Sequence, residues 1–403
     1  MSGLIQTVRE RIATLTSPSG TLRWWRRAQI AASPGTGIHH PPRHIVVLRL
    51  DGIGDAVMTV PLLRELRRRH PKARISLVVR PQAVNLFECC PYLDEVLGFE
   101  APEAGMLYGI RRHLRMARFC RTHWAESPPD VVLMPRFGAD KAGEAYFAWF
   151  SGAPVRRGFG EASNPWRKKS NAGCDLLLTD VVTHAGAEHE VLRDLRLIEA
   201  EGVSTPDTTL ELWTDAEDEN VAGMRLKDWE QPTGGCLIAV CPGAAKPNHV
   251  WPLDSFARCL DRLSRAGHRF IIVGGDDARG AGEELVRRFP GSVRSVAGQL
   301  TLRQTLAVIR KCDVVLSNDT SIVHLAAAVQ KPVVVLYPHP VGKDGTHPDH
   351  PPAFYPWKTV SQTLHPETTA SPCTGYCTAF STHCIRSIGV EQVTAAVAAI
   401  CVR

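Results

Sequence analysis

Short hydrophobic runs alternate with longer amphipathic segments along most of this chain. The runs lie at 45–50, 75–79, 131–134, 237–240, 270–273, 314–316 and 333–336. Continuous apolar runs of this length, bounded by turn residues, are typical of buried parallel strands. The segments between them have the spacing of amphipathic helices, and this alternation predicts parallel sheets with helices on both faces. We therefore expect an α/β protein built from Rossmann-like, doubly wound domains.

The chain is long enough for two such domains. Its 403 residues exceed the usual size of a single core. An acidic stretch at 215–220 and a Gly/Pro turn at 232–235 separate the two series of strands. We expect an appendage at 1–42, a first domain at 43–230 and a second domain at 231–403. The cleft between the two domains is the expected ligand site.

The appendage has the composition of a membrane-surface anchor. Apolar residues at helical spacing lie among arginines near its start, and Trp24 and Trp25 are flanked by arginines. This mixture is typical of interfacial segments. The alternative is a short helix that packs on the body, followed by a linker rich in Pro and Gly.

Charge and composition exclude several classes of protein. The net charge is +6, and much of the excess lies in arginine-rich runs at 22–27, 64–74 and 111–121. Such runs are solvated helix faces or contacts for anionic lipid or a phosphorylated acceptor. No zinc-finger or RNA-recognition pattern accompanies them, which argues against nucleic acid. The chain has no apolar run of membrane-spanning length and no signal core, and its 12 cysteines are scattered, so we expect a cytoplasmic protein with reduced thiols.

A polar elbow in the second half is the strongest local signal. The apolar run at 314–316 is followed by Asp319, and Thr320 and Ser321 then open an Ala-rich helix. Backbone N–H groups and hydroxyls at the start of a helix form an anion site, here beside a carboxylate. Ser or Thr in front of a helix can also be only a cap.

A second loop of the same domain has features of a phosphate site. Gly243, Ala244 and Ala245 follow a predicted strand, and small residues let backbone amides face a ligand. Lys246 or His249 could neutralise a diphosphate. These residues predict a phosphate loop at the carboxyl end of the strand.

A third loop, 274–277, follows the next strand. Its Asp277 could accept hydrogen bonds from ribose hydroxyls. Three such loops at the carboxyl ends of adjacent strands predict a site for a nucleotide diphosphate.

The first domain has a Gly-rich turn after its first strand. Gly52 and Gly54 precede Asp55, which does not match the GxGxxG fingerprint of nicotinamide enzymes. Glycine allows another molecule to approach the backbone closely. Asp55 is therefore either a carboxylate that stabilises a helix start or a base at the mouth of the cleft.

Together these segments resemble the heptosyltransferase family, glycosyltransferase family 9, which builds the inner core of bacterial lipopolysaccharide. The resemblance extends from about residue 45 to 393. It rests on 48–55 with Pro61 and Leu66, on 189–195, on 242–244 with Trp251 and Pro252, on Gly274 and Gly275, on 317–321 with His324, and on the Cys-rich tail.

The resemblance implies a GT-B fold, with the acceptor bound mainly by the first domain and the nucleotide-sugar mainly by the second. It also implies an inverting reaction without a catalytic metal, in which Asp55 is the general base. Such a carboxylate must lie within hydrogen-bond reach of the attacking hydroxyl. The leaving diphosphate is then stabilised by helix N-termini and cations.

The donor-site roles also follow from the resemblance. Thr320 and Ser321 match the phosphate-binding elbow, and Asp319 matches a contact to the donor sugar. The chain departs from the family in front of Trp251, where many relatives carry Lys or Arg and this chain has His249 and Val250. Lys246 is a candidate to compensate for this loss of charge.

His324 and a cluster of cysteines near the C-terminal end can each be interpreted in two ways. His324, one turn into its helix, is either a diphosphate contact or a packing residue. Cys373, Cys377 and Cys384, with His383 adjacent, have metal-like spacing, but the four-ligand pattern of zinc sites is incomplete. Some heptosyltransferases that modify proteins are similar in carrying a cysteine-bound iron in this region. We favour reduced thiols over a structural metal.

We therefore expect an enzyme that moves a heptose from ADP-heptose onto a sugar acceptor. The acceptor is expected to be lipid-linked and to lie at the inner face of the membrane. Catalysis is expected to need no cofactor. One alternative keeps the fold and the base but uses another nucleotide-sugar donor or a protein or small-molecule acceptor. A second alternative is a non-catalytic nucleotide-sugar-binding protein. A third is an epimerase of UDP-sugars, which shares the GT-B architecture.

Overall fold

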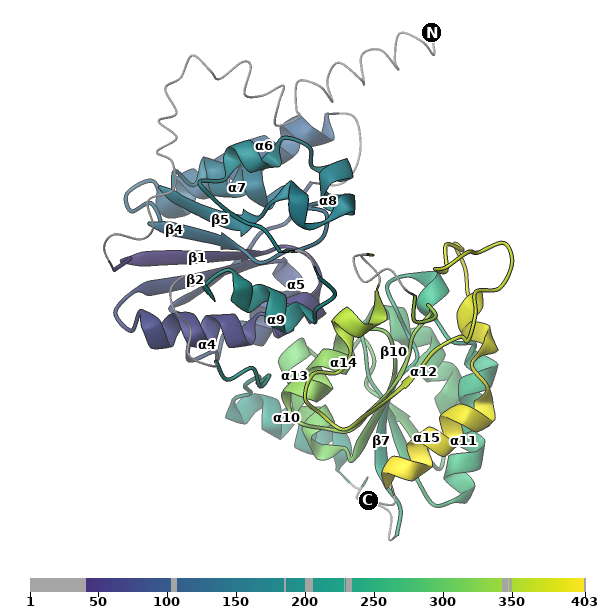
Figure 1. Cartoon of the computed structure of the whole chain (residues 1–403). Coiled ribbons are helices and arrows are strands. Elements are labelled where there is room, and N and C mark those ends of the chain that lie inside the picture. The colour runs from purple at the N-terminus through teal and green to yellow at the C-terminus, as the bar shows by residue number, and fades with distance from the viewer. Residues whose placement is uncertain are drawn as a thin grey trace. The chain divides into compact units, whose positions relative to one another are not determined.

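The computed structural model describes residues 41–102, 107–184, 186–199, 206–227, 229, 234–342, 347 and 350–401. The anchor predicted at 1–42 lies outside the described residues except for its last two. The chain divides into two compact α/β units (Figure 1). The first unit ends at Asp207, and the second begins at Thr208 and also contains Asn85–Cys90.

The first unit is a parallel six-stranded sheet with the order β3-β2-β1-β4-β5-β6. Its strands are β1 (His44–Arg49), β2 (Arg74–Val79), β3 (Glu95–Gly98), β4 (Val131–Met134), β5 (Val155–Phe159) and β6 (Asp180–Val182). Its helices are α3 (Ile53–Met58), α4 (Val60–Arg69), α5 (Pro81–Phe87), α6 (Tyr108–Trp124), α7 (Glu144–Phe150), α8 (Pro165–Ser170) and α9 (Glu190–Arg196), with short 3-10 turns η1 (Glu161–Ser163) and η2 (Cys174–Leu177). Helices α6 and α7 cover one face of the sheet, and α4 and α9 cover the other (Figure 1). This is the doubly wound order of Rossmann-like domains.

The second unit repeats this arrangement with the order β12-β11-β10-β7-β8-β9. Its strands are β7 (Leu237–Cys241), β8 (Arg269–Ile272), β9 (Val293–Ser295), β10 (Val314–Asn318), β11 (Val333–Leu336) and β12 (Ser361–Leu364). Its helices are α10 (Ala216–Leu226), α11 (Leu253–Arg265), α12 (Asp276–Arg288), α13 (Leu302–Lys311), α14 (Ser321–Ala328) and α15 (Val390–Cys401), with 3-10 turns η4 (Pro247–His249), η5 (Pro351–Phe354) and η6 (Cys384–Ser387). With β7 counted as the first strand, both sheets have the same strand order, so the predicted pair of Rossmann-like domains is confirmed.

The division between the units differs from the boundary expected at 230/231. It lies between Asp207 and Thr208, so that α10 belongs to the second unit. Helix α10 packs against α13, and Arg303 near the start of α13 forms ion pairs with Asp215 at 2.8 Å and Asp218 at 2.9 Å. The acidic stretch that was expected to close the first domain therefore holds a helix onto the second.

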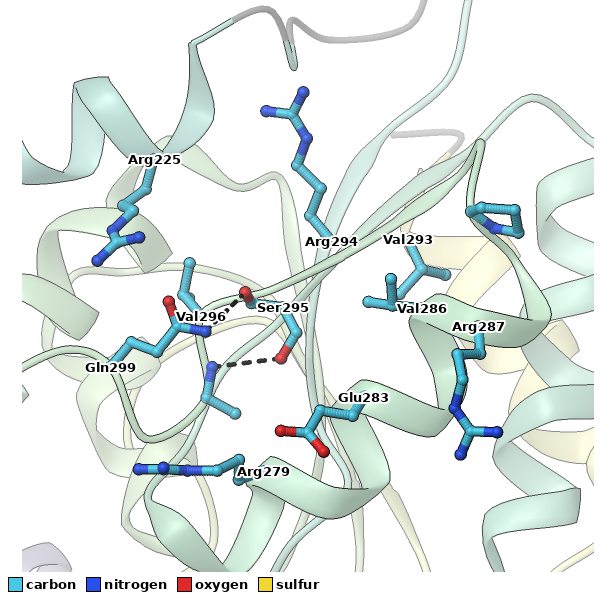
Figure 2. A pocket seen from close by; sticks show the side chains of 12 residues that line it. Arg225, Arg279, Glu283, Val286, Arg287, Val293, Arg294, Ser295, Val296 and Gln299 are labelled. Carbon is cyan, nitrogen blue, oxygen red and sulfur yellow. Dashed lines mark hydrogen bonds between the residues drawn. The ribbon is translucent and has the colours of Figure 1, made fainter.

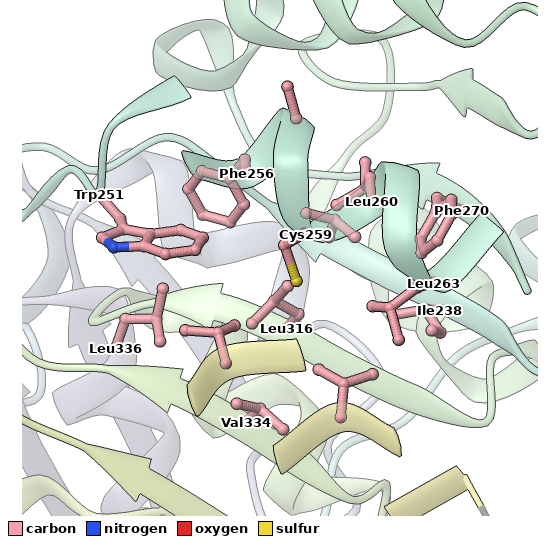
Figure 3. Packing of buried hydrophobic residues seen from close by; sticks show 14 of the residues in the cluster. Ile238, Trp251, Phe256, Cys259, Leu260, Leu263, Phe270, Leu316, Val334 and Leu336 are labelled. Carbon is pink, nitrogen blue, oxygen red and sulfur yellow. The ribbon is translucent and has the colours of Figure 1, made fainter. Parts of the chain in front are cut away.

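The core of the second unit includes the fully buried Trp251 (Figure 3). Its ring meets Phe256 of α11 edge-on, with 4.9 Å between centroids, above the inward side chains of the central strands. The indole N–H donates to the carbonyl of Ile388 at 3.0 Å. A buried aromatic of this size contributes about 3–5 kcal/mol to stability. Trp251 therefore fixes the segment that follows the predicted phosphate loop.

Within the described part of the chain, no helix is both long enough and apolar enough to cross a bilayer.

Candidate active site

Asp55 lies in the first turn of α3, just after the first and central strand of the first unit. Its Oδ2 accepts a hydrogen bond from the backbone N–H of Gly52 at 2.9 Å, and Gly54 lies between them as the second residue of α3. A Cβ at position 52 would lie 2.6 Å from that oxygen, although the φ of −87° suits any residue. Gly52 is therefore required for the close approach of the carboxylate and not for backbone conformation.

A buried arginine, Arg49 at the end of β1, is surrounded by carboxylates. Its side chain has no exposed surface. Its guanidinium nitrogens lie 3.2 Å from Asp51, 3.6 Å from Asp55, 3.4 Å from Glu190 and 3.4 Å from Asp194. One cation thus holds four acids that come from three elements of the fold. A buried charge is tolerated when it is paired in this way.

Two more arginines complete the network. Arg136 contacts Asp51 at 2.6 Å, and Arg193 contacts Glu190 at 2.6 Å. The fully buried Asp194 accepts a hydrogen bond from the Thr59 hydroxyl at 2.7 Å. Burial raises the pKa of Asp194 well above its ordinary value, even though Arg49 opposes that shift.

Asp55 has the acidity that a general base needs near neutral pH. Burial, and then the neighbouring Asp51, raise its pKa to about 7, while Arg49 and Arg136 act in the opposite direction. Its side chain is nevertheless 22% exposed, so a ligand can reach it. Proton transfer is most efficient when the pKa of the base lies near the working pH. The Asp55 carboxylate thus has a raised pKa and is still accessible to a ligand.

Glu144, the first residue of α7, extends the same network from the other face of the sheet. It accepts a hydrogen bond from the backbone N–H of Leu50 at 2.8 Å. Burial raises its pKa to about 8, and the negative charges of Asp140 and Asp51 add to the effect. Glu144 therefore fixes the chain where β1 turns toward Asp55.

Sequence reasoning missed most of this network. Arg49 lies in the run 45–50, which predicts only a strand, and the segment 189–195 is marked only by its family resemblance. Three charged residues of that segment, Glu190, Arg193 and Asp194, are buried in the structure. The available signal was a helix start that carries several charges among apolar residues.

In the second unit, the predicted elbow forms at the carboxyl end of β10. Thr320 is the N-cap of α14, and its Oγ1 accepts a hydrogen bond from the N–H of Ile322 at 3.3 Å. The hydroxyls of Ser317 and Thr320 lie 3.1 Å apart. The capping role of Thr320 is therefore confirmed. Asp319 and Ser321 are partly exposed beside it, and the phosphate role of the elbow stays a prediction.

Asn318 joins two of the predicted loops, a role that sequence reasoning missed. Its side-chain oxygen accepts from the N–H of Trp251 at 3.1 Å. Its amide nitrogen donates to the carbonyls of Pro242 at 2.9 Å and Gly243 at 3.2 Å. The side chain is completely buried. It thus holds the loop after β7 against the end of β10.

The third loop meets the same edge of the sheet, because β10, β7 and β8 are neighbours. A Cβ on Gly243 would lie 2.7 Å from Asp277 Oδ2 and 2.8 Å from the Ala278 nitrogen. Asp277 is the second residue of α12 and not part of the predicted loop. Its side chain is exposed at the helix start, where a carboxylate is favoured by the helix dipole. The three predicted segments therefore lie together.

The exposure of the other donor-side residues differs sharply. Ala245 and Lys246 are exposed and Ala244 is partly exposed, whereas His249 and His324 are buried. His249 Nδ1 lies 3.3 Å from Asp319 Oδ2, so the chain places an imidazole against this carboxylate.

His324 lies among the buried residues of α14, as its packing interpretation expects. Its predicted contact with the diphosphate stays a prediction.

The cysteines of the C-terminal tail come together in the second unit. Cys373, Cys377, His383 and Cys384 place one sulfur or ring-nitrogen atom each within 4.8 Å of the others. All 12 cysteines of the chain are free thiols in the structure. His383 therefore adds a fourth possible ligand atom to the three sulfurs.

A separate hollow of about 790 Å³ lies beside α12 and β9 (Figure 2). Its charged lining includes Arg225, Arg279, Arg287 and Arg294, with Glu283 among them. It contains none of the residues that were predicted to bind the donor.

Two Rossmann-like units, one with a carboxyl of pKa about 7 after its first strand and the other with three loops at one sheet edge, are the arrangement found in glycosyltransferases of the GT-B class. The chain belongs to glycosyltransferase family 9 (heptosyltransferase), whose family model matches residues 140–380.

Relatives and solved structures agree with this membership. Lipopolysaccharide heptosyltransferase 2 of Salmonella typhimurium is 27% identical over 319 residues, which cover 75% of this chain and 85% of that protein. A solved glycosyltransferase of family 9 from Veillonella parvula has a TM-score of 0.69 at 20% identity and covers 89% of this chain and 97% of its own. The solved ADP-heptose lipopolysaccharide heptosyltransferase II of E. coli has a TM-score of 0.64 at 22% identity and covers 89% and 98%. These likenesses confirm the predicted fold class.

Proposed function

We propose that this enzyme transfers a heptose from ADP-heptose to a sugar of the lipopolysaccharide inner core, with inversion at the anomeric carbon. The observation that carries the proposal is Asp55, a partly exposed carboxyl with a pKa of about 7 at the start of α3 in a chain of family 9. The names of the relatives support the substrate class, because they are lipopolysaccharide and lipooligosaccharide heptosyltransferases. One solved E. coli relative is described with ADP.

In the proposed reaction, Asp55 accepts the proton of an acceptor hydroxyl. The oxygen then forms a bond to the anomeric carbon as the bond from that carbon to the diphosphate oxygen breaks. The electron pair leaves with ADP, and attack opposite the leaving group inverts the carbon. Arg49 and the Gly52 N–H hold the carboxylate in one orientation for this transfer.

The second unit is proposed to bind the leaving diphosphate through backbone groups. The start of α14 at Thr320 and Ser321, and the loop of Gly243, Ala244 and Ala245, supply N–H groups that stabilise developing negative charge. Lys246 is exposed at the end of that loop and would add a cation.

Two carboxylates, Asp319 and Asp277, would complete the donor site, with His249 as the partner of Asp319. Asp319, oriented by His249 at 3.3 Å, would contact the sugar. Asp277 would contact the ribose.

Replacing Asp55 by Asn tests the proposal. The amide keeps the shape but cannot accept a proton, so we expect turnover with ADP-heptose and a lipopolysaccharide core acceptor to fall about 10²- to 10⁴-fold. Binding of ADP, measured by calorimetry, should stay within about twofold, because the change leaves phosphate contacts intact. The matched control is Asp261→Asn, a partly exposed acid of α11.

Full turnover in the Asp55→Asn variant would reject this residue as the base. The product is read by mass spectrometry in parallel reactions with UDP- and GDP-sugars and with peptide acceptors, which distinguishes the alternative donors and acceptors. No turnover with any donor in the parent protein would favour a binding protein. Membership in family 9 favours a transferase over an epimerase.

A lipid-linked acceptor is supported by the outer face of α6. Leu107, just before the helix, and Ile110 and Leu114 within it are large apolar residues with exposed side chains, and Leu114 is 66% exposed. Arg111 and Arg115 are exposed beside them. Apolar residues bordered by arginines are typical of helices that lie on an anionic membrane. We propose that this face contacts the membrane that carries the acceptor.

Replacing Leu114 by Ser should weaken binding to anionic vesicles about tenfold, because burying a leucine side chain in an apolar phase contributes roughly 1.5–3 kcal/mol. Co-sedimentation at low and high salt measures the effect, and salt should weaken the parent as well. Met224→Ser on α10, an equally exposed apolar residue of the second unit, is the control. Equal binding by the Leu114 and Met224 variants would remove α6 as the contact.

A further inference from the structure

The Cys-rich loop between β12 and α15 has the geometry of a metal site. Cys373 Sγ lies 3.6 Å from His383 Nδ1, and that nitrogen lies 3.3 Å from Cys384 Sγ. Ligands around a tetrahedral zinc ion, at roughly 2.3 Å for sulfur and 2.1 Å for nitrogen, are separated by roughly 3.5–3.8 Å. Two of the spacings are therefore close to those of a tetrahedral site, and all four ligand atoms lie within 4.8 Å of one another.

Backbone groups are directed at the sulfurs, as in a thiolate site. The N–H of Thr378 donates to Cys373 Sγ at 3.4 Å, and the N–H of Ala370 donates to Cys384 Sγ at 3.4 Å. Such donors stabilise the negative charge that a metal-bound sulfur carries, and they orient it. Three sulfurs and one imidazole are a common donor set for structural zinc.

Ordinary packing does not explain the cluster. The three cysteines form an apolar cluster of their own, against which the described residues pack only the partly buried Ala379. So small a cluster buries little apolar surface to order a loop. A metal ion would supply the missing stabilisation.

The cluster also connects to the donor side of the same unit. The N–H of Cys377 donates to Nδ1 of His339 at 3.0 Å. The His339 ring meets the ring of His249 edge-on, with 5.4 Å between centroids, and His249 contacts Asp319 at 3.3 Å. The hydroxyl of Thr382 donates to the carbonyl of Pro247 at 3.3 Å, in the turn that carries His249. The loop therefore supports His249 from two sides.

We propose that Cys373, Cys377, His383 and Cys384 bind one thiophilic transition-metal ion, zinc or iron, and that this ion holds the loop against His339 and thereby positions His249 and Asp319. The metal is structural and takes no part in bond making or breaking. The positioning of Asp319 rests on the proposed function of the donor site, whereas the metal site itself does not.

A second group, Cys236, His268 and Cys401, also brings three ligand atoms together. In this group the Nδ1 of His268 already accepts a hydrogen bond from the N–H of Cys236 at 3.0 Å. It offers one ligand fewer and serves as the internal control.

The first test measures metal in the full-length protein, purified without a histidine tag or chelators, by inductively coupled plasma mass spectrometry. We expect about one equivalent of zinc or iron per chain in the parent and in Cys236→Ala. His383→Ala and Cys384→Ala should lose most of it, and His383→Cys, which restores a fourth ligand, should retain it. Visible absorption from thiolate-to-iron charge transfer separates iron from zinc, which is colourless.

Two results would overturn the site. One is a parent protein that contains no metal as isolated and retains none after incubation with Zn²⁺ or Fe²⁺ followed by gel filtration. The other is equal metal loss in Cys236→Ala and Cys384→Ala. Circular dichroism of each variant shows whether it folds, and the His383→Cys variant keeps the test valid if the alanine variants do not.

The connection to the donor side is tested separately with ADP as the probe. His383→Ala should weaken ADP binding several-fold in calorimetry, and His383→Cys should restore it. If metal is present but ADP affinity is the same in both variants, the positioning role is rejected while the metal site stands. Because metal content is read without turnover, failure of the proposed sugar transfer would leave the site unaffected.

Discussion

The two units share a strand order but carry opposite chemistry where their first strands end. After β1, the chain leads into buried charges, with Arg49 among four carboxylates and Arg136 and Arg193 around them. After β7, it leads into Gly243 and two alanines, held by the neutral side chain of Asn318. The edge after β1 thus consists of charged side chains, whereas the edge after β7 consists of backbone groups and a side-chain amide.

The difference fits the role that we propose for each edge. A base must have its pKa adjusted. Burial raises the pKa of Asp55, Asp51 raises it further, and Arg49 and Arg136 lower it, so that the pKa reaches about 7. A diphosphate site requires positive backbone dipoles that a ligand can approach closely, and small residues permit this. On one unit the scaffold therefore carries a carboxyl with a raised pKa, and on the other unit its backbone groups are suited to bind an anion.

The largest expected effect is on Arg49. Replacing it by Met leaves four carboxylates without their central cation, and we expect a loss of about 3–5 kcal/mol of unfolding free energy. The loss should be smaller at pH 6 than at pH 8, because Asp55, with a pKa of about 7, becomes neutral as the pH falls and then no longer needs the cation.

Urea unfolding at both pH values measures the effect. Arg265→Met, which breaks an exposed ion pair on α11, is the control and should cost less than about 1 kcal/mol. If Arg49→Met lowers the free energy of unfolding no more than this control does, the buried charges do not stabilise the first edge and the two edges do not differ in this respect.

Asn318→Ala tests the neutral edge. The change removes three hydrogen bonds and leaves the N–H of Trp251 and two carbonyls without their partner, which should cost about 1–3 kcal/mol. Because none of these groups titrates, the cost should be the same at pH 6 and pH 8. ADP affinity should fall as well. A cost that depends on pH would show that this edge, too, is governed by charge.

The smallest effect is a shift of the activity profile. In the parent enzyme, kcat/KM should rise with pH through about 7 as Asp55 loses its proton. The positive charge of Arg136 lowers the pKa of Asp55, so Arg136→Met should move this rise to higher pH. Steady-state kinetics from pH 5.5 to about 9 measure the shift. A rise at the same pH in both enzymes would show that Arg136 does not tune the base.

The sequence predicted the features that are local in the chain. Each long apolar run became a buried strand, and the elbow at Thr320 formed where the polar residues interrupt the pattern. Short strands such as β3 and β6 were not predicted, because they are only partly buried and have no continuous apolar run.

The features that escaped prediction depend on distant residues. Arg49 meets Glu190 across 141 positions, and nothing near it in the sequence marks it as different from other strand residues. Helix α10 belongs to the second unit, where it packs on α13 and where Arg303 pairs with Asp215, again across a long separation. Buried ion pairs of this kind appear only when the helices are placed on the sheet.

The repeated strand order has a consequence for how such an enzyme can diversify. Because each sheet closes its own hydrophobic interior, substitutions at the edge that is suited to nucleotides need not disturb the edge that carries the proposed base. Recombination near Asp207 would exchange one specificity while leaving the other intact. Chimeras joined at this point with another member of the family should therefore fold and inherit each preference from a separate parent.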